Sequence, residues 1–164
     1  MRKVYLSAVL LLNVVSMQAQ KITKGSFGVL ANKKTVNITI DYSDSKIAGV
    51  PFEAFLETET KWEEGYNEIM LKFVKAANQN SSGIIYSSKK TTDYQLVFKA
   101  IDVDGDGETS GCLLLLDKDN NVIAVAEKIN ANGGKFGSQL NLMSDASERL
   151  GRKVAQFIKK QLKR

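Results

Sequence analysis

Apolar and polar residues alternate along several short stretches of the chain, which is the pattern of strands with one buried face. The clearest alternation covers residues 94–103, and a shorter apolar stretch covers residues 84–86. Residues 35–42 alternate in the same way and follow another apolar stretch, residues 25–30, across the turn-rich segment 31–34. We expect the last two stretches to pair as a hairpin and the others to form single strands.

A run of leucines breaks this alternation. Residues 112–116 read Cys-Leu-Leu-Leu-Leu, so polar residues do not separate the apolar ones. Such a run is typical of a central strand that is covered on both faces. The tight-turn residues 118–121 then lead into the apolar stretch 122–129, which predicts a second hairpin.

Apolar residues at spacings of three and four predict two helices. The first pattern runs over residues 52–77 and follows Pro51, a residue suited to a first helical turn. It is long, and a break near residues 58–60 or at Gly65 is an open alternative. The stripe that includes Trp62 is expected to face the core.

The second helical pattern covers residues 142–162, where Asp145 and Glu148 resemble a capping pair at its start. Strands joined by hairpins, together with two helices, indicate an α+β domain. We predict a single, largely antiparallel sheet of about five to six strands. A long central helix and a C-terminal helix are expected to pack on one face of this sheet.

The start of the chain has the composition of a secretory signal peptide. Two basic residues precede an apolar run at residues 4–15, and this run of about twelve residues is too short to span a bilayer. We expect cleavage near Ala19, so that residues 1–19 are the signal and residues 20–164 are one domain. An uncleaved anchor or a buried first strand is the alternative. The product is expected in the periplasm or outside the cell.

Cysteine and histidine usage excludes several chemistries. Cys112 is the only cysteine, so no intramolecular disulfide forms, and it is expected to be a buried apolar side chain. Gln20 stands where a lipoprotein needs a cysteine, so we expect no lipid anchor. The chain has no histidine, which removes the usual general base and a common zinc ligand. These features predict a protein that is not an enzyme; catalysis by carboxylates alone is the alternative.

The charge balance gives little evidence that the protein binds nucleic acid. The formal charge is +5, with 23 basic and 18 acidic residues, and loss of the two basic residues in the signal leaves 21 against 18. No later segment is apolar enough for a membrane span. Basic residues crowd the last helix, which agrees either with a solvated face or with binding to an anionic surface.

One loop resembles the start of a calcium-binding loop. Asp102, Asp104 and Asp106 alternate and a glycine follows at the sixth position, as in the EF-hand. The twelfth position is Leu113 rather than glutamate, and the flanks are predicted strands, so the loop is not an EF-hand. A calcium turn that uses Glu108 as a further ligand is one interpretation, and a solvated turn is the other.

The C-terminal part of the chain, residues 94–164, resembles the periplasmic α+β domains of the curli-secretion lipoprotein group and of many other exported Gram-negative proteins. The matching parts are the strand 94–100, the apolar strand 112–116, the turn 119–121, the returning strand 122–126 and the helix 146–158. This resemblance implies a noncatalytic role in the cell envelope. The missing cysteine at the cleavage site departs from the lipoprotein members.

Two functions therefore remain open from the sequence. The first is an exported, noncatalytic envelope protein that binds a protein, a peptide or another envelope component. The second is a calcium-dependent binding domain that uses Asp102, Asp104, Asp106 and Glu108. No cofactor other than calcium is expected.

Overall fold

The structure is a computed structural model that describes residues 20–163, so the predicted signal peptide lies outside the described residues. Eight strands form one sheet in the order β1-β8-β7-β6-β2-β5, with β3 beside β6 and β4 beside β3. The strands are β1 (Lys21–Gly25), β2 (Thr35–Asp41), β3 (Lys46–Ile47), β4 (Val50–Pro51), β5 (Ile85–Ser87), β6 (Tyr94–Val103), β7 (Thr109–Asp117) and β8 (Val122–Ala131). The sheet has more strands than the sequence predicted, because the two-residue strands carry too little pattern to be recognised.

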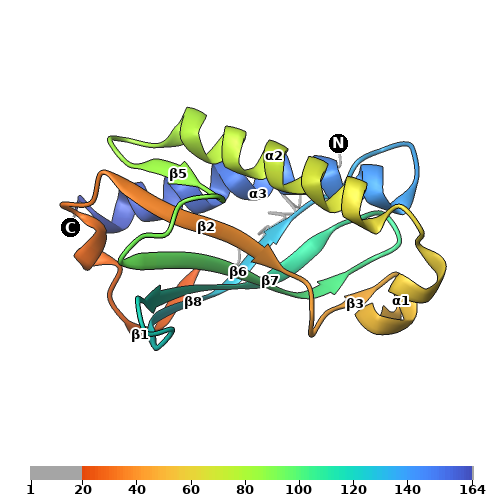
Figure 1. Cartoon of the computed structure of the whole chain (residues 1–164), viewed down its shortest axis with the longest axis horizontal. Coiled ribbons are helices and arrows are strands. Elements are labelled where there is room, and N and C mark those ends of the chain that lie inside the picture. The colour runs from red at the N-terminus through yellow and green to blue at the C-terminus, as the bar shows by residue number, and fades with distance from the viewer. Residues whose placement is uncertain (1–19, 164) are drawn as a thin grey trace, which may run out of the picture.

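The helices lie on one side of this sheet. Helices α2 (Trp62–Asn80) and α3 (Gln139–Gln161) run along one face, and the short α1 (Phe52–Thr58) lies at one end beside β3 (Figure 1). The protein is therefore a mixed α+β fold with an open sheet and three α-helices among its described residues. No helix within residues 20–163 is long and apolar enough to cross a membrane.

The strand pairing is more mixed than the largely antiparallel sheet predicted. Strand β7 pairs in the antiparallel sense with β6 and β8, as the hairpin patterns indicated. Strand β2, in contrast, pairs in parallel with both β5 and β6. A parallel pair needs a long crossover, and α2 supplies the crossover from β2 to β5.

The hairpin predicted from residues 25–30 and 35–42 is wrong. Strand β1 pairs instead with β8, at the other side of the sheet. The apolar residues that follow β1 are core contacts rather than strand residues: Phe27 and Leu30 are fully buried, and the Phe27 ring lies 5.3 Å from the ring of Phe157 on α3. Residues 25–30 close one end of the core and are therefore as rich in apolar residues as a short strand. Their composition alone does not distinguish the two structures.

The predicted long central helix is divided at residues 59–61, close to the break that the sequence left open. Helix α1 ends at Thr58 and α2 begins at Trp62. The change of direction lets the Trp62 ring pack against Phe52 and Phe55, with ring centroids 5.0 and 6.0 Å away. This aromatic contact gives a physical reason for the break.

Helix α3 begins earlier than predicted. Ser138 is its N-cap, and its Oγ accepts a hydrogen bond from the Asn141 N–H at 3.3 Å. Asp145 and Glu148 therefore lie within the helix and do not cap it. Asp145 forms an ion pair with Lys72 on α2, with 3.1 Å between Oδ1 and Nζ.

Helices α2 and α3 run in the same direction and pack closely. Successive contacts advance along both helices: Ser147 Oγ donates a hydrogen bond to the Ile69 carbonyl oxygen at 2.9 Å, and Gly151 lies against the Phe73 carbonyl. A Cβ atom at Gly151 would lie 2.2 Å from that carbonyl oxygen. Small residues on α3 thus let the two backbones approach, and both helices start at the same end of the molecule.

The leucine run of β7 is covered on one face only. Leu113 and Leu115 are fully buried beneath the helices, but Leu114 and Leu116 point to the opposite face and are half-buried. The expectation that both faces of this strand are covered is therefore wrong within residues 20–163. It fails because the outward positions hold apolar residues that no helix of this region covers (Figure 1).

Candidate functional site

The face of the sheet opposite the helices, called here the open face, is the candidate site. In an antiparallel sheet with one solvated face, the outward positions are normally polar. Here Val97, Leu114 and Val125 lie directly opposite one another on β6, β7 and β8, and Leu116 lies two residues further along β7. All four are half-buried. We call these four residues the apolar strip.

Two β-bulges distort the sheet at one end of this strip. On β6, the pairing with β7 skips Ile101, whose side chain is 58% exposed. On β8, two residues, Glu127 and Lys128, face the single residue Cys112 of β7. Lys128 adopts a left-handed backbone conformation with φ of 61°. Bulges of this kind redirect side chains and increase the local twist.

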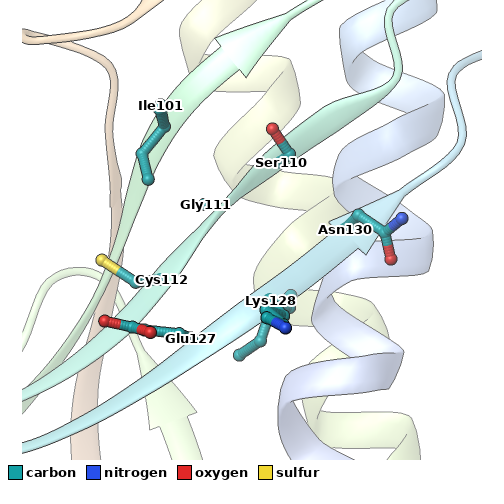
Figure 2. A pocket seen from close by; sticks show the side chains of 8 residues that line it. Ile101, Ser110, Gly111, Cys112, Glu127, Lys128 and Asn130 are labelled. Atoms are coloured by element: carbon teal, nitrogen blue, oxygen red, sulfur yellow. The ribbon is translucent and has the colours of Figure 1, made fainter. Parts of the chain in front are cut away.

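The two bulges frame a hollow of about 370 Å³ on the open face, called here the Cys112 hollow. Figure 2 shows that its lining comes from three adjacent strands, with the helices behind the sheet. The lining residues are Ile101, Ser110, Gly111, Cys112, Glu127, Lys128, Ile129 and Asn130. The hollow therefore combines an exposed isoleucine, a thiol and a pair of opposite charges.

Cys112 is half-buried and points to this hollow, whereas the sequence predicted a fully buried side chain. Burial raises the pKa of the thiol, nearby Lys99 lowers it, and Glu127 raises it. The net direction is upward, so the thiol stays protonated at neutral pH. A protonated thiol is a poor nucleophile.

A second hollow of about 510 Å³, called here the lysine hollow, lies at the other end of the open face. Its lining is polar and consists of Asn37, Thr39, Ser88, Lys89, Lys90, Thr91, Thr92, Gln95, Asp117, Lys118 and Asn120. Asn37 holds the loop after β5 in place, because its Nδ2 donates to the Lys90 carbonyl at 2.8 Å and its N–H donates to Thr92 Oγ1 at 3.0 Å.

Asn37 also keeps one acceptor without a partner among the described residues. Within residues 20–163, its Oδ1 is the buried side-chain polar atom that has no hydrogen-bond partner. A buried polar atom without a partner costs free energy, typically about 1–3 kcal/mol.

The acidic loop between β6 and β7 is organised as a turn. Asp104 Oδ1 accepts hydrogen bonds from the N–H groups of Asp106 and Glu108 at 2.9 and 2.8 Å. Asp117 Oδ1 does the same in the turn between β7 and β8, for the N–H groups of Asp119 and Asn121. The same side-chain geometry thus appears in two turns, only one of which resembles a calcium loop.

The predicted calcium ligands are spread over this turn. Asp102 lies at the end of β6 and pairs with Ser110, while Asp104, Asp106 and Glu108 follow it, and all four are exposed. Among the described residues, no three histidine, cysteine, aspartate or glutamate side chains lie close enough together to hold a metal ion. Calcium binding by this loop stays a prediction.

The open-face residues were not predicted as a site. The available signal is the run Cys112–Leu116, in which both strand faces are apolar. The same pattern is typical of a strand that the protein itself covers on both faces. The bulges at Ile101 and Lys128 had no visible signal, because neither position holds the glycine that often marks a bulge.

Comparison with known proteins gives no family. No family model matches the sequence, and no curated protein matches it. Among solved structures, the PelC dodecamer from Paraburkholderia phytofirmans is 13% identical with a TM-score of 0.42, and the match covers 84% of this chain and 96% of that chain. A structure described as an uncharacterized protein is 12% identical with a TM-score of 0.36, over 79% of this chain and 88% of that one. Likeness at this level carries no conclusion about this chain, and the resemblance to the curli-secretion group stays a prediction.

Proposed function

We propose that this protein is a noncatalytic binding module of the cell envelope, which holds a partner protein or peptide on the open face of its sheet. The observation that carries the proposal is the apolar strip of Val97, Leu114, Leu116 and Val125. These side chains stand where a solvated sheet face carries polar ones, and no helix within residues 20–163 covers them.

The layout of the open face suits a partner that lies along the strands. The apolar strip supplies non-directional contact, and the hollows at its two ends supply hydrogen-bonding and charged groups. Burying the exposed part of these four aliphatic side chains, roughly a third of each or less, stabilises a complex by about 2 kcal/mol, since complete burial of one such side chain contributes about 1.5–3 kcal/mol. A polar rim around an apolar centre is the usual arrangement of a protein interface.

The proposal assigns no reaction to the site. The chain has no histidine, and the Cys112 thiol has a raised pKa. The predicted signal peptide supports a location in the periplasm or outside the cell, where a binding module can act on other exported proteins.

Site-specific photo-crosslinking tests the proposal in cells that produce the protein. A photo-reactive amino acid at position 114 samples the open face, and one at position 71 is the matched control, because Leu71 lies on α2 and is 69% exposed. We expect one discrete adduct from position 114 and none from position 71. Adding Val97→Lys to the position-114 protein should remove the adduct, because a charge would then stand within the apolar strip.

Three results would contradict the proposal. They are the absence of any adduct from position 114, equal adducts from both positions, and an adduct that persists in the Val97→Lys variant. Thermal melting of each purified variant shows separately that it is folded.

A further inference from the structure

Charged residues are strongly segregated along this chain. Residues 41–68 carry eight carboxylates and two lysines, and residues 102–108 carry four carboxylates and no basic residue. Residues 149–163 carry six basic residues and no acidic one. A modest net charge therefore conceals two large and opposite local charges.

The fold gathers most of the acidic residues at one end of the molecule and carries the last turns of the basic segment to the other end, whereas Arg149 at its start lies beside Gly133. Helices α2 and α3 start together, with Gly65 against Leu140, and α1 lies at the same end (Figure 1). The β6–β7 loop joins them there, because Gln139 Nε2 donates a hydrogen bond to the Asp104 carbonyl at 2.9 Å. We call this the acidic end; its exposed carboxylates are Glu53, Glu57, Glu63, Glu64, Asp104, Asp106 and Glu108.

The other end of the molecule collects lysines from three segments. The end of α3 lies there beside the connection from β1 to β2, as the contact of Phe27 with Phe157 shows. Strand β5 joins that connection through a hydrogen bond of 2.8 Å from the Ile85 N–H to the Lys34 carbonyl. We call this the basic end; its exposed lysines are Lys34, Lys89, Lys90, Lys160 and Lys163.

Ion pairs within residues 20–163 do not neutralise the carboxylates of the acidic end or the lysines of the basic end. The ion pairs between described residues include none of the seven carboxylates of the acidic end and none of the five lysines of the basic end. Like charges gathered in this way repel one another and weaken the folded state. A partner of opposite charge relieves that repulsion.

Helix dipoles explain only part of the pattern. Acidic residues at a helix start and basic residues at a helix end are each stabilised by about 0.3–1 kcal/mol. The acidic β6–β7 loop and the lysines at positions 89 and 90 do not belong to helices. The segregation therefore extends beyond what the two parallel helices need.

Exposed large apolar residues accompany the charges at both ends. Phe136, in the loop before α3, is 88% exposed, and Val50 and Leu56 beside α1 are 42% and 37% exposed. Near the basic end, Val29 is 45% exposed and Ile85 is 59% exposed. Each end thus offers apolar contact area together with an excess of one charge. Exposed Lys61 and Lys135 lie among the carboxylates of the acidic end, and Asp93 and Asp117 lie beside the lysines of the basic end.

We infer that copies of this chain associate head to tail, with the acidic end of one copy against the basic end of the next. A second copy presents the complement of each end in charge, and the contact would cover the exposed apolar residues. Such an interface joins two different surfaces, so it produces rows or closed rings rather than two-fold dimers. The contact leaves the apolar strip and the Cys112 hollow accessible, although it shares Lys89 and Lys90 with the lysine hollow. It does not rest on the function proposed above.

Salt dependence is the first test. Sedimentation velocity of the purified protein should show association at low ionic strength that disappears in about 0.5 M NaCl, because added salt shortens the Debye length to a few ångströms. A protein that stays monomeric at low salt and high concentration would overturn the inference. A monomer that instead binds a polyanion such as heparin would assign the basic end to a different partner, and this too would overturn it.

Charge reversal is the second and sharper test. Glu53→Lys with Glu57→Lys weakens the acidic end, which keeps five of its seven carboxylates against two new lysines, and Lys89→Glu with Lys90→Glu weakens the basic end, which keeps three of its five lysines. Each variant alone should self-associate at least about tenfold more weakly. An equimolar mixture of the two should associate again, because the unchanged basic end of the first variant meets the unchanged acidic end of the second. Lys21→Glu with Lys75→Glu is the control for net charge, because both lysines are exposed and belong to neither end, and it should associate like the unmodified protein.

Two outcomes of the charge-reversal test would contradict head-to-tail association. One is that either end variant associates as strongly as the unmodified protein. The other is that the mixture stays monomeric although both variants melt as folded proteins.

Discussion

Adjacent leucines of β7 should respond very differently to substitution if one face of the sheet is open. Leu115 is fully buried beneath the helices, whereas Leu114 lies on the open face and is half-buried. Leu115→Ala removes a core side chain and leaves a cavity, which costs about 2–5 kcal/mol of unfolding free energy. Leu114→Ala shortens a side chain that is already partly exposed and leaves no closed cavity, so we expect a loss of about 1 kcal/mol.

A charged residue makes this contrast sharper. Leu114→Lys should cost only slightly more than Leu114→Ala, because a lysine at position 114 extends its ammonium group into water. Leu115→Lys should prevent folding, since it buries an unpaired charge. Urea unfolding followed by circular dichroism gives each free energy. If Leu114→Lys and Leu115→Lys were equally damaging, the open face would be covered and the reasoning would be refuted.

Further predictions concern turns, helix packing and calcium. Ala48 has φ of 50° and is followed by Gly49 with φ of 85°, so Ala48→Asn should raise the unfolding free energy by about 0.5–1 kcal/mol, because asparagine tolerates that conformation; a loss of stability in urea unfolding would contradict this. Gly151→Ala should lower stability by about 1–2 kcal/mol, because overlap with the Phe73 carbonyl outweighs the better helix propensity of alanine. Gly105→Ala, which meets no atom within 4 Å, is its control and should be neutral. Millimolar calcium should leave the Tm unchanged, since Asp104 Oδ1 already accepts two backbone hydrogen bonds; a clear rise in Tm would show a calcium site.

The regular elements could be predicted because their side-chain periods are long and clear. The strand at residues 94–103 appears with the predicted bounds, and the terminal helix was found from its apolar stripe. The start of that helix was missed because Asp145 and Glu148 imitate a cap, whereas Ser138 is the residue that caps it. The pattern of charged residues along the sequence does not show which polar residue has the backbone conformation that a helix N-cap needs.

Strand order and the candidate site could not be predicted, because both depend on contacts between distant segments. The parallel pairing of β2 with β5 and β6 leaves no mark in the sequence of β2 itself. The run Cys112–Leu116 indicated apolar surroundings on both faces, and only the arrangement of the helices shows which face remains open. The two charged ends were visible as separate segments, but their positions depend on α2 and α3 running in the same direction.

Cys112 provides the most direct test of the claim that the open face is the binding surface. It is the only cysteine of the chain and lies half-buried on that face. A thiol reagent should therefore label it in the folded, purified protein, although slowly, because burial raises the pKa of the thiol. In intact cells that produce the protein, the account predicts that a bound partner protects Cys112 from the same reagent. Equal rates of labelling in cells and in the purified protein would contradict the account.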